Sequence, residues 1–364
     1  MRLSIDVTPL AGGARTGVGQ AVLHTVRALQ ARADLTVMPY ALSWRARDQR
    51  HDLPHGTQFP PIPARILMKA WARADFPAID RWIGAPNVIH ATNYLTPPSR
   101  RPTVVTVHDC WFIRHPDHVA PDVRVYERVL RRAVARGAWI HAVSEHGARE
   151  ATELLGVTAD RIRVVPWGIP PVSAPTVIAP AVQRIMNDGP FVLSLGALEP
   201  RKNLVRLVDA FASINDASLV LAGPDGRDSD AVNAAIDRLP PDARSRVHRL
   251  GVVSNDVASG LLANAAVLAY PSLDEGFGFP LLEAMRVDTP VVAAASGAIP
   301  EVAGDAAVLV DPADTVALAT AIREVVTDTS VRNRLIAAGR DRAALFTWER
   351  TADGLVALYE AAAR

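Results

Sequence analysis

The same pattern of short apolar runs and helical stretches occurs in both halves of this chain, and it limits the folds that the chain can adopt. Short apolar runs, each followed by a stretch with helical spacing, occur in the second half at residues 191–196, 219–223, 247–251, 266–272, 291–297 and 306–310. Apolar runs without polar alternation are typical of strands buried on both faces, as in parallel sheets that helices cover. The pattern therefore predicts a doubly wound α/β domain.

The first half follows the same pattern, with strands predicted at 2–7, 103–108 and 139–143 and a helix at about 20–31. At 364 residues the chain is too long for one ordinary core. Residues 170–190 are rich in proline and small side chains, which predicts a linker. We therefore expect two α/β domains, over 1–170 and 186–346, with their doubly wound parallel sheets facing a cleft.

Composition narrows the class of protein further. Hydrophobic residues make up 49% of the chain and charged residues 21%, which is typical of a globular protein. The first residues lack a signal-like apolar segment, no run of about 18 apolar residues occurs, and Cys110 is the single cysteine. These features predict a cytoplasmic protein without a disulfide or a cysteine zinc site.

Charge is divided unevenly. Residues 1–175 carry 22 Lys and Arg against 14 Asp and Glu, and the rest carry 17 against 24, so the two parts have net charges of +8 and −7. Such a division indicates either a basic face for an anionic acceptor or membrane, or two domains that attract each other.

The sequence EGFGFPLLE at 275–283 is the strongest candidate site. It follows a predicted strand and enters a helix whose first turn is set by Pro280. Gly276 and Gly278 leave the backbone open around Phe277, so that main-chain N–H groups near a helix N-terminus can bind sugar or phosphate oxygens. The carboxylates of Glu275 and Glu283 can accept hydrogen bonds from sugar hydroxyls; two solvated acids beside a glycine turn are the alternative.

A second candidate is LGALEPRKN at 195–203, directly after the first strand of the second half. Arg201 and Lys202 stand in a strand-to-helix loop, and we expect Asn203 to cap the helix. Two cations there can neutralise a diphosphate and the charge that grows on it as a leaving group. The alternative is an exposed basic turn.

Two weaker candidates lie in the first half. The segment GGARTGVGQ at 12–20 places Gly17 and Gly19 after the first strand, without the full spacing of a dinucleotide-binding loop. His108 ends the strand TVVTVH at 103–108, where an active-site histidine of a parallel sheet would stand.

At these residues the chain resembles the retaining glycosyltransferases of family 4, in the group 1 class, with the GT-B fold. Further matching segments are TGVGQ (16–20), VHD (107–109), AVSEHGARE (142–150), VVPWGI (164–169), LAGPDG (221–226) and FTWERTA (346–352). The resemblance covers nearly the whole chain and is mannosyltransferase-like. It implies an acceptor-side domain over 1–170, a nucleotide-sugar donor domain over 186–346, and a final helix, 347–364, that packs back on the first domain.

The resemblance also implies roles for the candidate residues. Glu275 would contact the transferred sugar and Glu283 the nucleotide ribose, while Arg201 and Lys202 hold the diphosphate. His108 would approach the sugar from the first domain. The remaining donor-binding positions implied are Gly17, Gly19, Gly276, Phe277 and Gly278.

Two positions depart from the family pattern. Many relatives have an arginine where this chain has Ala197, and an asparagine where Trp167 stands. The first departure leaves Arg201 and Lys202 as the cations of that loop.

We therefore predict a retaining hexosyltransferase that needs no metal and no cofactor. The specific expectation is transfer of mannose from GDP-mannose to a hydroxyl of a surface glycan or lipid-linked acceptor, with no nucleic-acid partner. Glucose, N-acetylglucosamine, galactose and rhamnose donors stay open. A nucleotide-sugar epimerase and a non-catalytic sugar-binding relative are the alternatives, and the intact candidate residues argue against the second.

Two basic stretches predict peripheral contact with the inner face of a membrane. Residues 65–84 combine four cations with Trp71 and Trp82, and residues 127–140 contain Arg128, Arg131, Arg132 and Arg136. Basic residues beside aromatic ones are typical of an interfacial helix. An ordinary amphipathic helix with a solvated basic face is the alternative.

Overall fold

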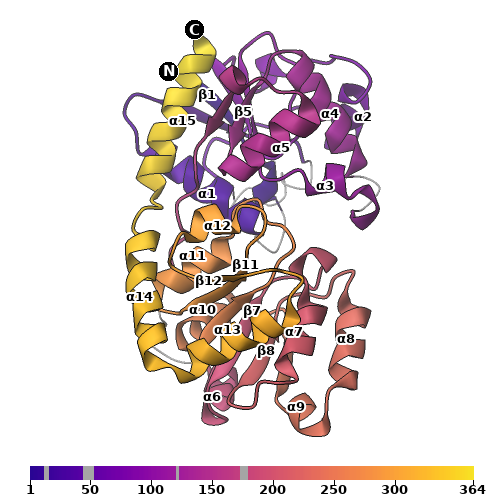
Figure 1. The fold of residues 1–364 in the computed structure, drawn as a ribbon. Helices are drawn as coiled ribbons and strands as arrows, with labels where there is room; N and C mark the ends of the chain where they lie inside the picture. Colours follow the sequence, from indigo (N-terminus) through magenta and orange to yellow (C-terminus); the bar gives the residue numbers. More distant parts are fainter. Residues whose placement is uncertain (12–15, 44–52, 120–122, 173–178) are drawn as a thin grey trace. The chain divides into compact units, whose positions relative to one another are not determined.

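The computed structural model describes residues 1–11, 16–43, 53–119, 123–172 and 179–364. Its contacts divide the chain into two compact units. Unit 1 comprises Met1–Pro170 and Phe346–Arg364, and unit 2 comprises Pro171–Leu345. Both units are α/β (Figure 1).

Unit 1 is built on a six-stranded parallel sheet with the strand order β2-β1-β3-β4-β5-β6. The strands are β1 (Arg2–Asp6), β2 (Thr36–Tyr40), β3 (Val88–Ala91), β4 (Thr103–Val107), β5 (Trp139–Ala142) and β6 (Ile162–Val164). The three strands predicted here are confirmed, and the structure adds β2, β3 and β6. Pro39 interrupts the β-branched pattern of β2, and β3 and β6 are only four and three residues long.

Helices cover both faces of this sheet. They are α1 (Gly17–Gln30), α2 (Ala64–Trp71), α3 (Trp111–Arg114), α4 (Arg124–Ala135), α5 (Glu145–Leu155) and α15 (Trp348–Ala363). α1 and α15 pack together and α15 contacts β3, β4 and β5, while α2 packs with α4. Figure 1 shows α15, in yellow, running beside the strands of unit 1.

The expected basic helix over 65–84 is wrong, because α2 ends at Trp71. The Trp71 ring is fully buried, and its Nε1 donates a hydrogen bond to the Pro77 carbonyl at 3.0 Å. The second basic stretch is helical only to Ala135, since Gly137 has a φ of +83° and β5 follows.

Unit 2 contains a second six-stranded parallel sheet, in the order β12-β11-β10-β7-β8-β9. The strands are β7 (Phe191–Leu195), β8 (Ser218–Ala222), β9 (Val247–Gly251), β10 (Val267–Tyr270), β11 (Val291–Ala294) and β12 (Val308–Val310). All six correspond to predicted apolar runs, and most end one to three residues earlier than predicted because the last residues form the loops.

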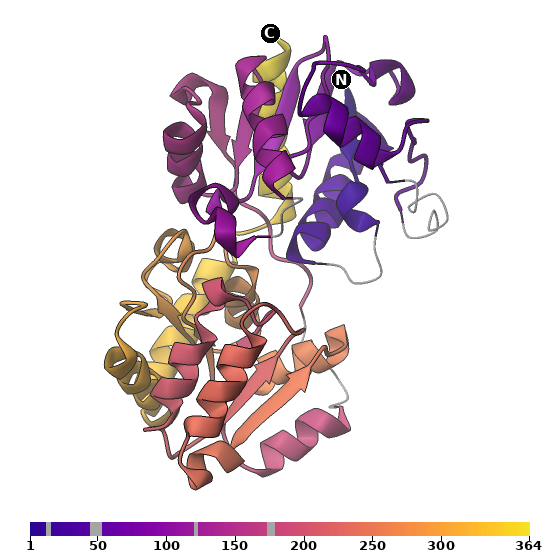
Figure 2. The ribbon, with the colours of Figure 1, turned by 90° about the vertical axis from the view of Figure 1, so that its right-hand side faces the viewer.

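The helices of unit 2 complete a doubly wound arrangement (Figure 2). They are α6 (Pro180–Asn187), α7 (Leu204–Phe211), α8 (Ser229–Arg238), α9 (Pro241–Ser245), α10 (Asn255–Asn264), α11 (Phe279–Arg286), α12 (Ile299–Ala303), α13 (Thr315–Thr327) and α14 (Thr329–Ala343). α7 packs with α8 and α13, and α10 packs with α6 and α11.

Part of the predicted linker is a helix. Pro180 stands in the first turn of α6, where its fixed φ suits a helix start. Val182 and Ile185, three residues apart, are buried on one face. The linker prediction is therefore wrong for residues 180–187, while residues 173–178 lie outside the described part of the chain.

The strand order of unit 2 locates its ligand-binding edge. The chain moves outward from β7 to β9, then returns to add β10 on the other side of β7. In open α/β sheets ligands bind beyond the carboxyl ends of the strands at such a switch point. The loops after β7 and β10 are therefore where a ligand is expected. Within the described residues, no helix combines the length and apolar character needed to cross a membrane.

Candidate active site

The loop after β7 presents Arg201 and Lys202 in a short 3-10 turn, Pro200–Lys202. Asn203 follows with a φ of +56° and precedes α7. Its side chain does not cap the helix, which corrects the prediction. The Asn203 amide instead donates to the carbonyls of Pro271 and Pro312, at 3.0 and 2.9 Å. Asn203 thereby ties the cation loop to the loop after β10.

Both cations reach Glu275, in the loop after β10. Lys202 Nζ lies 2.6 Å from Glu275 Oε1, and the Arg201 guanidinium forms an ion pair with Glu275 Oε2. Arg201 also donates to the Asp274 carbonyl at 2.6 Å. The side chains of Lys202 and Glu275 are only 16% and 8% exposed, so water screens this pair weakly. Residues separated by more than 70 positions thus form one charged cluster.

The charge of Glu275 is fixed by this cluster. Burial alone would raise its pKa, but the charges of Lys202 and Arg201 outweigh burial and lower the pKa to about 2. Glu275 is therefore a carboxylate at neutral pH. It holds the two cations at the edge where an anionic ligand is expected.

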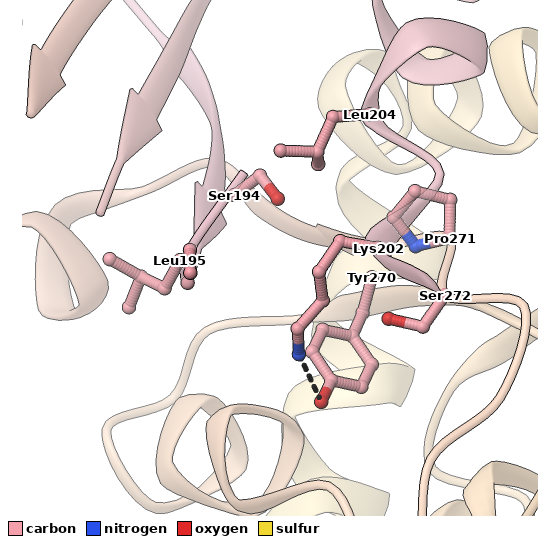
Figure 3. A pocket seen from close by; sticks show the side chains of 9 residues that line it. Ser194, Leu195, Lys202, Leu204, Tyr270, Pro271 and Ser272 are labelled. Carbon is pink, nitrogen blue, oxygen red and sulfur yellow. Dashed lines mark hydrogen bonds between the residues drawn. The ribbon is translucent and has the colours of Figure 1, made fainter. Parts of the chain in front are cut away.

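Tyr270, the last residue of β10, positions Lys202. Lys202 Nζ donates a hydrogen bond to the Tyr270 hydroxyl (Figure 3), with 3.2 Å between the two atoms. The same nitrogen lies 4.8 Å from the centre of the Tyr270 ring. The lysine side chain also crosses Gly196, where an added Cβ would lie 3.4 Å from Lys202 Cε. Sequence reasoning missed Tyr270, although its place at the end of a predicted strand was a usable signal.

A narrow pocket lies beside Lys202, between the ends of β7 and β10 (Figure 3). Gly196, Ala197 and Ser272 are among the residues that line it. Ser272 Oγ is buried and has no hydrogen-bond partner in the described part of the chain.

The loop after β11 supports Glu275 from its backbone side. The N–H of Ala298 donates to the Glu275 carbonyl at 2.8 Å. Gly297 has a φ of +56°, and a Cβ added there would lie 2.6 Å from Glu275 N. Only glycine fits this close approach without displacing the loop. This is a second contribution that the sequence analysis did not identify.

The remaining residues of the EGFGFPLLE motif connect Glu275 to α11. Gly278 has a φ of +107° and is the residue before the helix. Phe277 is buried and its ring packs on Phe279 with 5.2 Å between ring centres. Gly276 lies between Glu275 and Phe277 in the same loop. Glu283 lies past the first turn of α11, and burial raises its pKa to about 7.

The candidates of unit 1 belong to a separate unit. His108 follows β4 and donates from Nε2 to the Thr92 carbonyl at 3.0 Å. Burial lowers the pKa of His108 to about 4, so the ring is neutral at pH 7 and its Nδ1 is the acceptor nitrogen. Gly17 and Gly19 stand in the first turn of α1, where the Gly19 N–H donates to the Thr16 hydroxyl at 3.2 Å. Residues 12–15 of the glycine-rich segment lie outside the described residues.

Comparison with known proteins identifies the family. Residues 15–172 match the model described as Glycosyltransferase Family 4, and residues 178–342 match Glycosyl transferases group 1. O-antigen chain mannosyltransferase B from Escherichia coli is 30% identical over 305 residues, which cover 80% of this chain and 77% of that protein. The chain belongs to the family 4 glycosyltransferases.

Solved structures show the same fold as this glycosyltransferase. Sucrose-phosphate synthase from Thermosynechococcus elongatus has a TM-score of 0.75 at 22% identity, covering 99% of this chain and 98% of that one. HepE from Anabaena, solved in complex with UDP and glucose, has a TM-score of 0.74 at 21% identity, with 98% of each chain covered. The predicted GT-B class, with two parallel-sheet α/β units, is therefore confirmed.

Proposed function

We propose that this glycosyltransferase transfers mannose from GDP-mannose, with retention of configuration, to a hydroxyl of a surface-glycan or lipid-linked acceptor. The cluster of Lys202, Arg201 and Glu275 at the switch point of unit 2 carries the proposal. The likeness to an O-antigen chain mannosyltransferase supports the choice of sugar and acceptor.

In this proposal Arg201 and Lys202 bind the donor diphosphate. As the bond between the sugar and the diphosphate breaks, negative charge grows on the leaving group, and cations already in place stabilise it without reorganisation. Their ion pairs with Glu275 keep both cations at the pocket edge before the donor binds. The diphosphate has to compete with Glu275 for them, which leaves the carboxylate available to a sugar hydroxyl.

Two further residues have a role toward the donor in this proposal. Glu283 accepts hydrogen bonds from the ribose hydroxyls once it is ionised. His108 offers Nδ1 as an acceptor to a sugar hydroxyl, because its Nε2–H is held by Thr92. Since the cations supply the charge stabilisation, we propose that the reaction needs no metal ion.

A ligand panel tests the donor. A ligand that binds only the folded state raises the melting temperature, so GDP-mannose should stabilise the protein more than UDP- and dTDP-linked sugars do. Turnover of GDP-mannose with an oligosaccharide-lipid acceptor, in EDTA, tests the reaction, and the anomeric configuration of the product tests retention. If a different nucleotide sugar is the only one that stabilises the protein, that sugar is the donor in place of GDP-mannose. Isomerisation of the sugar without transfer to the acceptor would indicate an epimerase.

A further inference from the structure

A line of buried polar side chains crosses the face of the unit 1 sheet that α15 covers. Tyr359 of α15 contacts His90 Nδ1 at 2.7 Å, and His90 Nε2 contacts Thr106 Oγ1 at 2.8 Å. Thr106 Oγ1 contacts His141 Nδ1 at 2.9 Å, and His141 Nε2 contacts the Val165 carbonyl at 2.9 Å. Tyr359, His90, Thr106 and His141 are all fully buried. None of them takes part in the proposed reaction.

One arrangement of protons satisfies the whole line. The Val165 carbonyl can only accept, so His141 carries its proton on Nε2 and, being neutral, accepts at Nδ1 from Thr106. The Thr106 hydroxyl then accepts from His90 Nε2, and His90 Nδ1 accepts from the Tyr359 hydroxyl. Burial lowers the pKa of His141 to about 4 and that of His90 well below its usual value, in keeping with two neutral rings. The Val165 carbonyl thus sets the direction of every bond, and the Tyr359 hydroxyl is the donor that completes the line at its other end.

The line ends on a segment that α15 holds along its length. Thr351 donates to the Pro166 carbonyl at 2.8 Å, and Trp348 Nε1 donates to the Ile169 carbonyl at 2.9 Å. Between them, a Cβ added at Gly168 would lie 2.5 Å from Trp348 N, so the two backbones touch. The segment from Val165 to Ile169 is thus fixed by α15 and by His141.

This segment carries Trp167, which supports His108. The Trp167 ring is 1% exposed; its centre lies 4.7 Å from that of His141, edge to face, and 6.2 Å from that of His108. Tyr94 contacts His108 edge-on with 5.7 Å between ring centres. His108 therefore has an aromatic ring as neighbour on two sides and the Thr92 carbonyl at Nε2. Trp167, whose effect the sequence does not assign, packs between the polar line and His108.

We propose that Tyr359 is a positioning residue for His108, acting through His90, Thr106, His141 and Trp167. The inference rests on the proposed function only in taking His108 to be catalytic. Without the Tyr359 hydroxyl, His90 Nδ1 has no donor, so the proton of His90 can move to Nδ1 and Thr106 can then donate to His90 Nε2 instead of His141 Nδ1. The His141 ring is then held by the Val165 carbonyl alone, and Trp167 loses its fixed place against His141 and His108.

The test compares Tyr359→Phe with Tyr40→Phe. Tyr40 is also fully buried in unit 1, but its hydroxyl has no hydrogen-bond partner among the described residues, so its variant controls for the loss of a buried hydroxyl. A single hydrogen bond predicts a kcat about five- to tenfold lower for Tyr359→Phe, with an unchanged donor KM. Tyr40→Phe should keep both parameters within about twofold.

Nitrogen NMR of histidine-labelled protein gives a readout independent of turnover. Imidazole nitrogen shifts distinguish a protonated from an unprotonated ring nitrogen, and single histidine substitutions assign the signals. In the wild type His90, His141 and His108 should each show one tautomer, with Nε2 protonated. Tyr359→Phe should mix the tautomers of His90 and shift the His141 Nδ1 and His108 signals, whereas Tyr40→Phe should leave all three rings unchanged.

A second pair covers the case in which Tyr359→Phe does not fold. Thr106→Val removes the hydroxyl at nearly constant shape, and Thr106→Ser keeps it, so only the valine variant should lower kcat and mix the tautomers of His90. Unchanged kcat, or a lowered kcat with unmoved His108 signals, overturns the proposal. If His108→Gln turns over like the wild type, the catalytic role of His108 is wrong, and the NMR signals alone decide whether Tyr359 positions the ring.

Discussion

Lys202 and Arg201 test the donor site at the scale of single residues. We expect Lys202→Ala to lower kcat/KM by about 10²-fold, because a preorganised charge beside a developing anion contributes on that order. Arg201→Ala should be similarly harmful, since Ala197 supplies no charge in its place. Steady-state kinetics measures both, with Lys69→Ala, at the chain's other lysine, as the matched control. If Lys202→Ala and Arg201→Ala both turn over like the wild type, these residues do not bind the donor diphosphate.

Glu275 should have opposite effects on binding and on turnover. Because Lys202 and Arg201 are paired with this carboxylate, Glu275→Gln removes the negative charge that competes with a diphosphate for both cations. We expect affinity for GDP to rise about tenfold, or ~1.4 kcal/mol, while turnover falls by about 10²-fold. Titration calorimetry measures the affinity. Asp288→Asn, which breaks a surface ion pair with Arg340, is the control and should change neither. If Glu275→Gln binds GDP more weakly than the wild type, Glu275 does not compete with the diphosphate for Lys202 and Arg201.

Glu283 makes donor binding depend on pH. Burial raises its pKa to about 7, so the carboxyl is mostly protonated at pH 6 and mostly ionised at pH 8. If only the carboxylate binds the ribose hydroxyls, affinity for GDP-mannose should rise about tenfold over that interval. A nucleotide sugar is the right probe because its diphosphate does not titrate there. Glu283→Gln should bind GDP-mannose more weakly than the wild type at pH 8, and its affinity should not rise between pH 6 and pH 8. If the affinity of the wild type does not change with pH, another residue contacts the ribose.

The raised pKa of Glu283 also makes the stability of the fold depend on pH, and stability falls where donor affinity rises. Its folded-state pKa lies above the ordinary value of 4.5, so the unfolded chain ionises first. The contribution of Glu283 to stability is therefore fully present below about pH 4.5 and is lost as the pH rises through about 7. Donor binding and stability thus change in opposite directions between pH 6 and pH 8.

Sequence reasoning found the charged residues of the site but not the residues that hold them. Arg201, Lys202 and Glu275 carry chemistry that a motif shows. Tyr270 and Gly297 act through distances between loops that are far apart along the chain, and no local pattern encodes these distances. Asn203 shows the same limit: its type and place predict a helix cap, yet tertiary contacts with Pro271 and Pro312 take its side chain.

At the scale of elements, Gly297 links the loop after β11 to the site. Gly297→Ala should lower turnover by about tenfold or more, because its Cβ would displace Glu275. The matched control is Gly251→Ala, which shares a positive φ of +65° but meets nothing within 4 Å. Left-handed backbone costs each alanine about 1 kcal/mol, so both should melt a few degrees lower. Equal kinetics in the two variants would show that the loop tolerates the contact.

Strands and helices could be predicted from the sequence where a single hydrophobic pattern runs through the whole segment. The six strands of unit 2 are nearly pure apolar runs, so their existence and approximate bounds follow from the residues. In unit 1, β3 is the sequence VIHA, and its His90 looks polar until Tyr359 and Thr106 supply partners. The helix α6 was missed because the segment that contains it, residues 170–190, is rich in proline and small residues that also suit a linker. Only the burial of Val182 and Ile185 distinguishes the two.

At the scale of the whole molecule, the uneven charge of the chain raises the question of a membrane surface. The basic residues of α4 and its end were predicted to contact anionic lipid, but the structure gives most of them partners. Arg132 and Arg136 both pair with Asp75, at 2.9 and 2.6 Å, and Arg131 pairs with Glu127 at 2.8 Å. Each cation near an anionic surface contributes about 1 kcal/mol, so the pairs reduce what this cluster can supply.

We therefore expect weak, salt-sensitive flotation with vesicles that contain anionic lipid, and none with neutral vesicles. At low salt the Debye length is long enough for the unpaired charge of the cluster to act, and at about 0.5 M salt it is not. Asp75→Asn should increase flotation, because it frees Arg132 and Arg136, whereas Arg128→Gln should decrease it. Replacing Asp160, a carboxylate beside Arg161 outside α4, by Asn is the matched control and should leave flotation as in the wild type. If the wild type stays unbound at low salt and Asp75→Asn binds no better, α4 does not contact the membrane, and the charge division serves another purpose.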